Sequence, residues 1–219
     1  MIRLLGFLFS FMVCLQTEGR EFLAAGKDTS DVNSLLFHGV EYIKDLSNIK
    51  GNPLFPSDKY RGSVKYHGNW YRDIEITYDC EDELVIIRDM HDLLRLQLIN
   101  EKLEEFYIDE HHFVKTNVNE EGNKFYELIF KGKRTFLVKW TKTKSVDAKS
   151  DDTYILQRAF WVIEKGVFLN ISQKNEVFLL ANKHKGEVKR AVGKLNIKYK
   201  KEPVKYISAA LKIMEDKGW

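Results

Sequence analysis

Short apolar runs separated by turn residues occupy residues 37–172 of the chain. In Ile74–Tyr78 apolar and polar residues alternate with a period of two, which places one face of a strand against a core. Further runs are rich in aromatic and β-branched residues, as strands prefer, and cover 84–87, 125–130, 136–140, 154–163 and 167–171. The pattern therefore predicts a succession of strands.

Turn residues separate these runs. Lys131–Gly132–Lys133 and Glu164–Lys165–Gly166 each predict a tight hairpin with its glycine at positive φ. His67–Gly68–Asn69 and Asp109–Glu110–His111 mark two further turns. Such dense turns, without long helical patterns between them, indicate an antiparallel meander that a roll, small barrel or sandwich would close.

The pattern over residues 89–105 does not distinguish a strand from a helix, because its leucines follow neither the period of a strand nor that of a helix. We expect a strand over Leu94–Ile99 within it.

The pattern becomes helical after Ser172. Short helices are predicted over 174–183, with Ser172 accepting hydrogen bonds as a cap, and over 187–193. A third begins at Pro203. Val204, Ile207, Leu211 and Met214 form its apolar stripe at helical spacing. The sequence thus predicts an α+β fold, with a mainly antiparallel β domain at 37–172 and a basic helical subdomain at 173–219.

The first residues have the pattern of a signal peptide. Arg3 precedes a nearly unbroken apolar run over Leu4–Leu15, which is too short to span about 30 Å of hydrocarbon. We expect a signal peptide over 1–19, cut after Gly19, and a flexible lead-in over 20–36. The alternatives are an ordinary buried segment and a lipid anchor at Cys14. The interpretation predicts an exported protein, periplasmic, extracellular or outer-membrane associated, without a transmembrane span after cleavage.

Charge is unevenly distributed along the chain. Residues 172–219 hold 12 Lys and Arg against 5 Asp and Glu, a balance of +7, and the other 171 residues hold 23 against 27, or −4. The excess fits either a solvated helical face or attraction to an anionic surface or an envelope partner. The overall charge of +3 gives no indication of a nucleic-acid partner.

Recognisable catalytic and metal-binding motifs are missing from the sequence. The histidines have no HExxH spacing, and there is no GxSxG elbow or phosphate-binding loop. His111 and His112, adjacent on a strand, would point to opposite faces. Cys80 lies between Asp79 and Glu81, which disfavour its thiolate. We expect no enzyme activity, no cofactor and no metal.

Three aromatic residues near the turn at 67–69 are the candidate ligand-binding residues: Tyr66, Trp70 and Tyr71. Exposed aromatic rings on a β-scaffold stack on sugars or anchor a partner. The alternative is that the rings are simply buried in the core.

Several short segments together resemble an uncharacterised family of exported Bacteroidota proteins with a β-rich body and a lysine-rich helical C-terminus. They are Gly51–Phe55, Gly62–Tyr66 with Gly68, Tyr78–Asp79, Asp82–Leu84, Phe106, Phe113–Val114, Phe125–Leu128, Gly132–Lys133 and Lys174–Leu180. Glu110 departs from the pattern, since relatives often have glycine at that turn. The resemblance implies envelope localisation and supplies no catalytic residue.

Three functions follow as hypotheses. The first is a non-catalytic exported cell-envelope protein with an interaction or structural role. The second is a glycan- or small-ligand-binding module. The third is a hydrolase built on an unrecognised carboxylate pair, for which Glu81–Asp82–Glu83 and Glu104–Glu105 are candidates.

Overall fold

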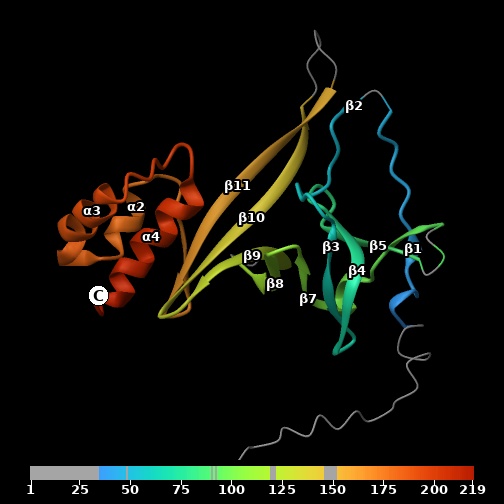
Figure 1. Ribbon diagram of the computed structural model, residues 1–219, viewed down its shortest axis with the longest axis horizontal. Helices are drawn as coiled ribbons and strands as arrows, with labels where there is room; N and C mark the ends of the chain where they lie inside the picture. Colours follow the sequence, from blue (N-terminus) through green and yellow to red (C-terminus); the bar gives the residue numbers. More distant parts are fainter. Residues whose placement is uncertain (1–34, 48, 90, 92, 119–121, 146–151) are drawn as a thin grey trace, which may run out of the picture.

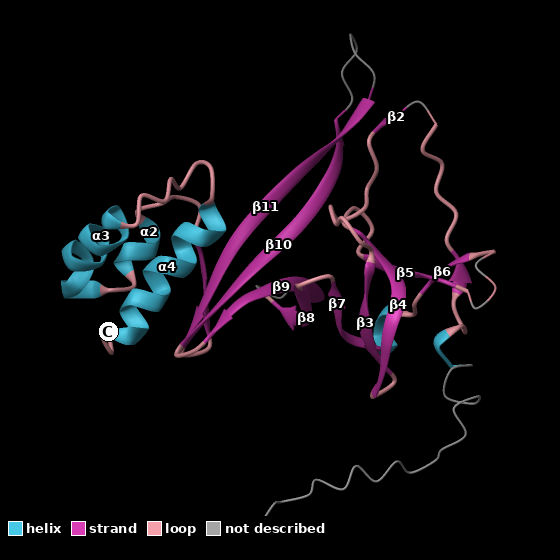
Figure 2. Cartoon of the chain, in the orientation of Figure 1, coloured by secondary structure: helices cyan, strands magenta, loops and turns pink. Residues whose placement is uncertain are grey.

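A computed structural model describes residues 35–47, 49–89, 91, 93–118, 122–145 and 152–219. The predicted signal peptide and residues 20–34 of the lead-in lie outside this part. The strands are β1 (Val40–Glu41), β2 (Ile49–Lys50), β3 (Arg61–Tyr66), β4 (Asn69–Asp79), β5 (Leu84–Arg88), β6 (Arg95–Gln97), β7 (Leu103–Ile108), β8 (His111–Asn117), β9 (Asn123–Lys131), β10 (Arg134–Ser145), β11 (Asp152–Glu164) and β12 (Val167–Asn170). Helices α2 (Glu176–Leu179), α3 (Lys185–Lys194) and α4 (Pro203–Asp216) follow. The α+β class is confirmed: a mainly antiparallel sheet precedes a short helical segment (Figure 2).

Strand β3 lies at the junction of two meanders. In the described residues the sheet has the order β1-β6-β5-β4-β3-β7-β8-β9-β10-β11-β12. From β3 the chain runs outward through β4, β5 and β6, returns through a 3-10 turn at Asn100–Lys102, and continues from β7 on the other side of β3. The short β2 pairs in parallel with the start of β11. The long β10–β11 hairpin lies between the helices and the other strands (Figure 1).

The ambiguous stretch at 89–105 contains β6 and the 3-10 turn, so the strand expected over 94–99 is present but shorter. The Asp89 carboxylate accepts hydrogen bonds from the backbone N–H groups of Leu93 and Leu94, at 2.6 and 2.8 Å. It thereby fixes a turn immediately before β6.

The two predicted hairpin glycines differ. Gly166 has φ +79°, next to Lys165 at +52°, as the tight turn requires. For Gly132 the prediction of positive φ is wrong, since it is not among the positive-φ glycines. A Cβ there would meet the carboxylate of Glu215 on α4, so the absence of a side chain at 132 leaves room for that carboxylate.

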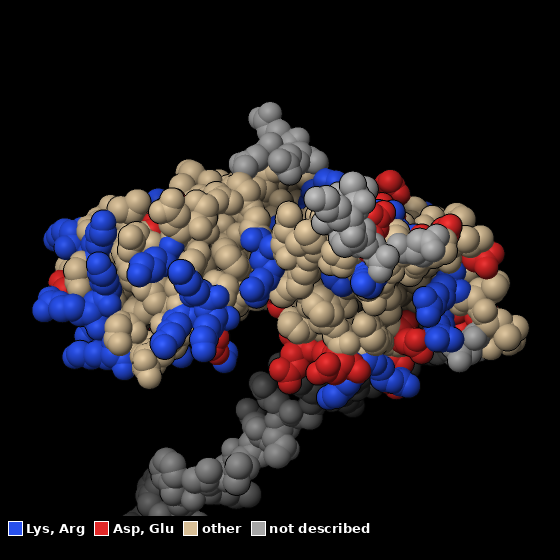
Figure 3. Space-filling view, turned by 90° about the horizontal axis from the view of Figure 1, so that it is seen from above, with Lys and Arg blue, Asp and Glu red and all other residues tan. Residues whose placement is uncertain are grey.

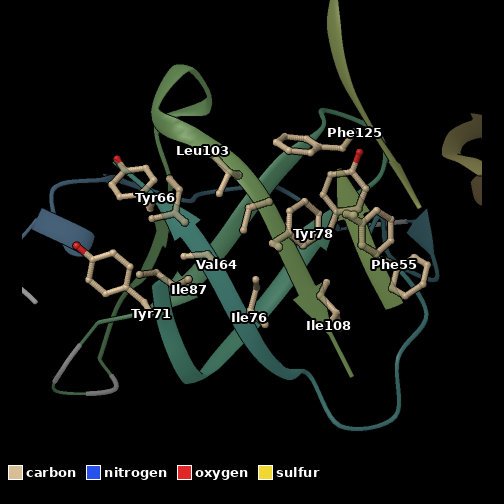
Figure 4. Packing of buried hydrophobic residues seen from close by; sticks show 14 of the residues in the cluster. Phe55, Val64, Tyr66, Tyr71, Ile76, Tyr78, Ile87, Leu103, Ile108 and Phe125 are labelled. Carbon is tan, nitrogen blue, oxygen red and sulfur yellow. The ribbon is translucent and has the colours of Figure 1, made fainter. Parts of the chain in front are cut away.

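A first core, the β-core, fills the space inside the curled strands β3–β8 and the start of β9. Tyr66, Tyr78 and Phe106 are fully buried or nearly so. Side chains from β3, β4, β5 and β7 converge there, and Phe55 closes one end from the loop before β3 (Figure 4). The rings pack edge-on or stacked; Phe106 and Phe113 are 4.7 Å apart at 9°, a separation that stabilises aromatic pairs beyond their buried area.

A second core, the helix core, lies between β10–β12 and the three helices. Phe136 and Val138 from β10 meet Val188 of α3 and Ile207 of α4. The predicted stripe of α4 is confirmed: Ile207, Leu211 and Met214 are buried and Val204 packs at the margin. No helix in the described ranges combines the length and the apolar character needed to cross a bilayer.

The helix expected over 174–183 is wrong in extent, since α2 covers only Glu176–Leu179. The Leu180 carbonyl accepts a hydrogen bond from the Arg134 guanidinium at 3.0 Å, and Asn182 takes a left-handed φ of +49°. The cap also differs: Ser172 donates to Glu176, whose carboxylate accepts the backbone N–H of Ser172 and Gln173 at 2.7 and 2.9 Å.

Candidate functional site

A large hollow lies on the helical lobe, which we define as residues 172–219. It is a groove of about 760 Å³, lined by Ser172, Gln173, Lys174, Gly193, Ile197, Lys198, Tyr199, Lys200, Lys201 and Tyr206. We call it the lysine groove. Its lining combines four ammonium groups with two tyrosine rings and an isoleucine.

In the segment between α3 and α4, half-buried apolar residues alternate with exposed lysines, and this alternation shapes the groove. Along residues 197–201, Ile197 and Tyr199 are half-buried, whereas Lys198, Lys200 and Lys201 are exposed. The Tyr199 ring packs edge-on to Tyr206 of α4 with centroids 5.5 Å apart. The segment thus turns its apolar side chains to the floor and its ammonium groups to the rim.

Among the described residues, no carboxylate lines the lysine groove. The two acids nearest to it along the chain already have partners: Glu176 accepts backbone hydrogen bonds at 172–173, and Glu202 pairs with Lys205 at 2.5 Å. In the space-filling view Lys and Arg cover the helical lobe, at left, and Asp and Glu gather over the strands, at right (Figure 3). The rim therefore lies in a positive field.

The three residues predicted as an exposed binding platform are not equivalent. Tyr66 is fully buried and Tyr71 is 5% exposed, both within the β-core; Trp70 is 37% exposed. Residues 66 and 71 pair with 69 and 64 across the hairpin, which puts both rings on its inner face. Tyr66 and Tyr71 therefore cannot offer their rings to a ligand.

Trp70 instead lies on the outer face, in a row with residues of β7 and β8. Its ring lies 5.8 Å from that of Tyr107 on β7, which stacks at 4.1 Å on His112 of β8. The Arg72 guanidinium covers the indole, 5.6 Å from its centroid. We call Trp70, Tyr107 and His112 the aromatic row. Trp70 meets the other two because β3 pairs with β7, a strand distant in sequence. A prediction based on turns alone therefore missed the row.

The adjacent histidines point to opposite faces, as predicted. His112 Nε2 is 2.8 Å from Glu105 on the outer face, whereas His111 Nδ1 is 2.5 Å from the buried Glu127. They therefore cannot share one ion.

An acidic cluster does form at Asp79, Glu81 and Asp82, where sequence reasoning expected no metal site. The ammonium of Lys44 lies 2.7 Å from a carboxylate oxygen of each. Burial raises the pKa of Asp79, but hydrogen bonds from Lys44, backbone N–H groups and Tyr42 outweigh it, and the pKa is lowered. The lysine of the chain itself occupies the place of a cation.

The carboxylate pairs considered for a hydrolase are engaged by cations. Glu83 lies 2.6 Å from Lys139, and Glu104 lies 2.7 Å from Lys65. Glu101 and Glu104 line a pocket of about 650 Å³. The hydrogen bond from Lys65 lowers the pKa of Glu104, whereas a general acid of a glycosidase needs a raised pKa.

Cys80 is buried, and burial raises the pKa of its thiol to about 12. A thiol that stays protonated at neutral pH is a poor nucleophile. The cysteine packs in the β-core. Its thiolate is disfavoured, as the sequence predicted, but the main cause is burial.

Sequence reasoning found the basic excess but missed Ile197, Tyr199 and Tyr206 as parts of a site. Alternation of lysine with Ile197 and Tyr199 was a usable signal, whereas Tyr206 reaches the groove only because α4 folds back. Comparison of the chain with protein-family models, curated proteins and solved structures finds no match.

Proposed function

We propose that this protein is an exported, non-catalytic component of the cell envelope that attaches to an anionic phospholipid surface through the lysine groove. The observation that carries the proposal is the combination of an apolar floor with a rim of Lys174, Lys198, Lys200 and Lys201. The signal-peptide pattern of residues 1–19 supports the exported location.

Phospholipid head groups match this arrangement in charge and in polarity. Lysine side chains near an anionic surface each contribute about 1 kcal/mol, and their stems lie along apolar surface while the ammonium stays in water. Tyrosine is favoured at the water–lipid boundary because its ring is apolar and its hydroxyl is polar. Tyr199 and Tyr206 stand in that position, below the lysine rim.

Vesicle co-sedimentation tests this attachment. The mature protein is mixed with vesicles of phosphatidylglycerol and phosphatidylcholine, or of phosphatidylcholine alone. Binding is expected only to the anionic vesicles and should weaken steeply with added salt. Equal binding to both vesicle types, or none to either, overturns the proposal.

A matched pair of charge-reversal variants separates the groove from the general charge of the lobe. Replacing Lys198, Lys200 and Lys201 by Glu should lower partitioning by roughly 100-fold, following the contribution of each lysine. Replacing Lys183, Lys185 and Lys189 by Glu changes the net charge equally at exposed positions outside the groove, and we expect less than about tenfold loss. Similar losses from both would assign the binding to overall charge.

The exported location has its own test. Fractionation of the native cells, with mass spectrometry of the mature N-terminus, should find the protein in the envelope beginning close to residue 20. A cytosolic protein that retains Met1 refutes this part of the proposal.

A second function, carbohydrate binding, is favoured by one observation, the aromatic row. Trp70 is 37% exposed and lies beside Tyr107 and His112 on the outer face, where Arg72 and Glu105 add polar groups. Sugars bind to exposed aromatic rings by stacking beside polar groups. Trp70→Ala and Tyr107→Ala should each abolish glycan-array binding, while Tyr199→Ala, on the helical lobe, should not. Binding that survives Trp70→Ala removes the assignment.

A further inference from the structure

A buried carboxylate holds His111 in one orientation in the β-body, which we define as residues 37–171. Glu127 of β9 is 5% exposed, and its two oxygens lie 2.5 Å from His111 Nδ1 and 2.6 Å from Trp140 Nε1. Phe55 packs edge-on against both the His111 ring, at 4.9 Å, and the Trp140 ring, at 5.1 Å. The imidazole is thus fixed by two kinds of contact.

This arrangement determines the tautomer of His111. An indole N–H only donates and an ionised carboxylate only accepts, so Glu127 accepts from Trp140 and also from Nδ1–H of His111. Nε2 is then the nitrogen that changes with protonation: an acceptor in the neutral ring and an N–H donor in the imidazolium. The hydrogen bond that His111 donates to Glu127, with the charges of Glu127, Asp109 and Glu110, raises the pKa of His111 against the effect of burial.

His111 faces a pocket of about 370 Å³ that the proposed membrane attachment does not use. Ligand pockets span about 300–1,000 Å³, so this one suits a small molecule. Its rim is the loop that carries Asn52 and Ser57, and its lining includes Asp109, His111 and Lys142.

One part of the pocket offers hydrogen-bond donors. The Lys142 ammonium donates to the Asn52 carbonyl at 2.9 Å and has two further N–H groups. The side-chain oxygen of Asn52 accepts from the Leu54 N–H at 3.0 Å, which leaves its NH₂ group as a donor. Together with Nε2–H of protonated His111, these groups are suited to a carboxylate.

The same pocket also offers acceptors, from the loop before β3 and from the turn between β7 and β8. The Asp109 carboxylate accepts from the Ser57 hydroxyl, which fixes it in the pocket, and Asp58 adds a second carboxylate to the lining. An ionised carboxylate that retains lone pairs binds an ammonium group strongly.

Because one pocket combines these donors and acceptors, we propose that it binds a small zwitterion, an amino acid or a short peptide. Its carboxylate lies against His111, Lys142 and Asn52, and its ammonium lies against Asp109 and Asp58. The site is independent of the lysine groove, since the two share no residue.

Four probes test the zwitterion requirement by calorimetry and by the imidazole NMR signals of the mature protein. Alanine and alanyl-alanine carry both charges, N-acetylalanine carries only the carboxylate, and alaninamide carries only the ammonium. At least one zwitterion should bind at least tenfold more tightly than either single-charge probe and shift the His111 signals. The preferred zwitterion distinguishes an amino-acid site from a peptide site. Equal affinities for all four, or no shift at tens of millimolar, overturn the proposal.

Matched variants assign the binding to these residues. His111→Gln and Asp109→Asn should each weaken zwitterion binding at least tenfold, whereas His112→Gln, the same exchange on the opposite face, should leave it unchanged. Thermal unfolding shows which variants are folded, and Asp109→Asn keeps the test valid if His111→Gln does not fold. An equal loss in His112→Gln refutes the site.

The pH response provides an additional readout. His111 faces Glu127, Asp109 and Glu110, and shares its pocket with Asp58 and Lys142. Carboxylate binding needs the protonated ring, so the affinity for alanyl-alanine should fall as the pH rises through the folded-state pKa of His111, which lies above its ordinary value of about 6.5. His111→Gln should remove that fall; its persistence in the variant contradicts the role of His111.

Discussion

The β-core and the helix core lie along one continuous sheet but are built differently. Of the seventeen buried residues of the β-core seven are aromatic, against two of fourteen in the helix core. Rings therefore fill the curled sheet, whereas aliphatic side chains seal the flatter contact between strands and helices. Planar rings tolerate the varied spacing inside a curled sheet because they pack edge-on or stacked.

The two regions also differ in how they depend on the rest of the chain. Neighbouring hairpins enclose most of the β-core, from β3 through β8. The helix core exists only because residues 172–219 return to cover one face of β10–β12. The helical lobe is therefore both a candidate binding surface and the cover of an otherwise exposed sheet face.

Removing the helical lobe should have the largest effect. Deletion of 174–219 would leave Phe136, Val138 and Val162 in solvent, and exposed apolar sheet faces promote association. We expect a shortened chain that aggregates or unfolds more than about 10 °C lower, measured by circular dichroism and light scattering. An unchanged midpoint in a monomeric product would show that the cover is dispensable.

One large-to-small substitution in each core tests whether the β-core and the helix core unfold together. Phe106→Ala and Phe136→Ala each remove a fully buried ring and should each cost about 3–5 kcal/mol. Because one ladder of strands joins the cores, both variants should shift a single transition in urea, followed by circular dichroism and tryptophan fluorescence. Two separate transitions, each sensitive to one variant, would contradict this coupling.

Local patterns predicted most of the β-body because its pairings are mainly between neighbours in sequence. Alternation over Ile74–Tyr78 and the turn at 165–166 are determined within a few residues. The features that were missed depend on distant contacts. Gly132 lies against the Glu215 side chain of α4, and the Leu180 carbonyl, just after the end of α2, accepts a hydrogen bond from Arg134.

The candidate sites, too, could be predicted from the sequence only where they do not depend on contacts between distant segments. The charge excess of residues 172–219 was visible in composition, but the floor of the lysine groove needs Tyr206 from another helix. Trp70 was identified, but its partner Tyr107 comes from β7, and its expected partners Tyr66 and Tyr71 face the β-core. Similarly, the environment of His111 depends on Glu127 and Trp140 of other strands.

An ion-pair cluster gives the β-body a stabilising feature that the helical lobe lacks among its described contacts. Lys44→Met keeps most of the aliphatic stem and leaves the fully buried Asp79 without its ammonium partner. We expect a loss of about 2–3 kcal/mol at neutral pH, somewhat below the usual cost of breaking a buried pair. Urea denaturation measures it, with Lys65→Met at an exposed pair as control, where a much smaller loss is expected.

Acid should remove the difference in stability between wild type and Lys44→Met. The folded-state pKa of Asp79 is lowered, so its contribution is present above the unfolded value of about 3.9 and is lost as the pH falls through the folded pKa. The gap between wild type and Lys44→Met should therefore close in strong acid. A gap that persists there would indicate lost packing, not lost charge.

The smallest effect concerns His111, where stability should depend on pH in the opposite direction. Its hydrogen bond to Glu127 raises the folded-state pKa, so the contribution is complete below the unfolded value of about 6.5 and is lost as the pH rises through the folded pKa. The stability advantage of wild type over His111→Gln, about 1 kcal/mol, should shrink in thermal unfolding as the pH rises above about 6.5 and through the folded-state pKa. Glu127→Gln removes the charge responsible, so it should flatten the same slope, and a slope retained in both variants would assign the pH dependence to other groups.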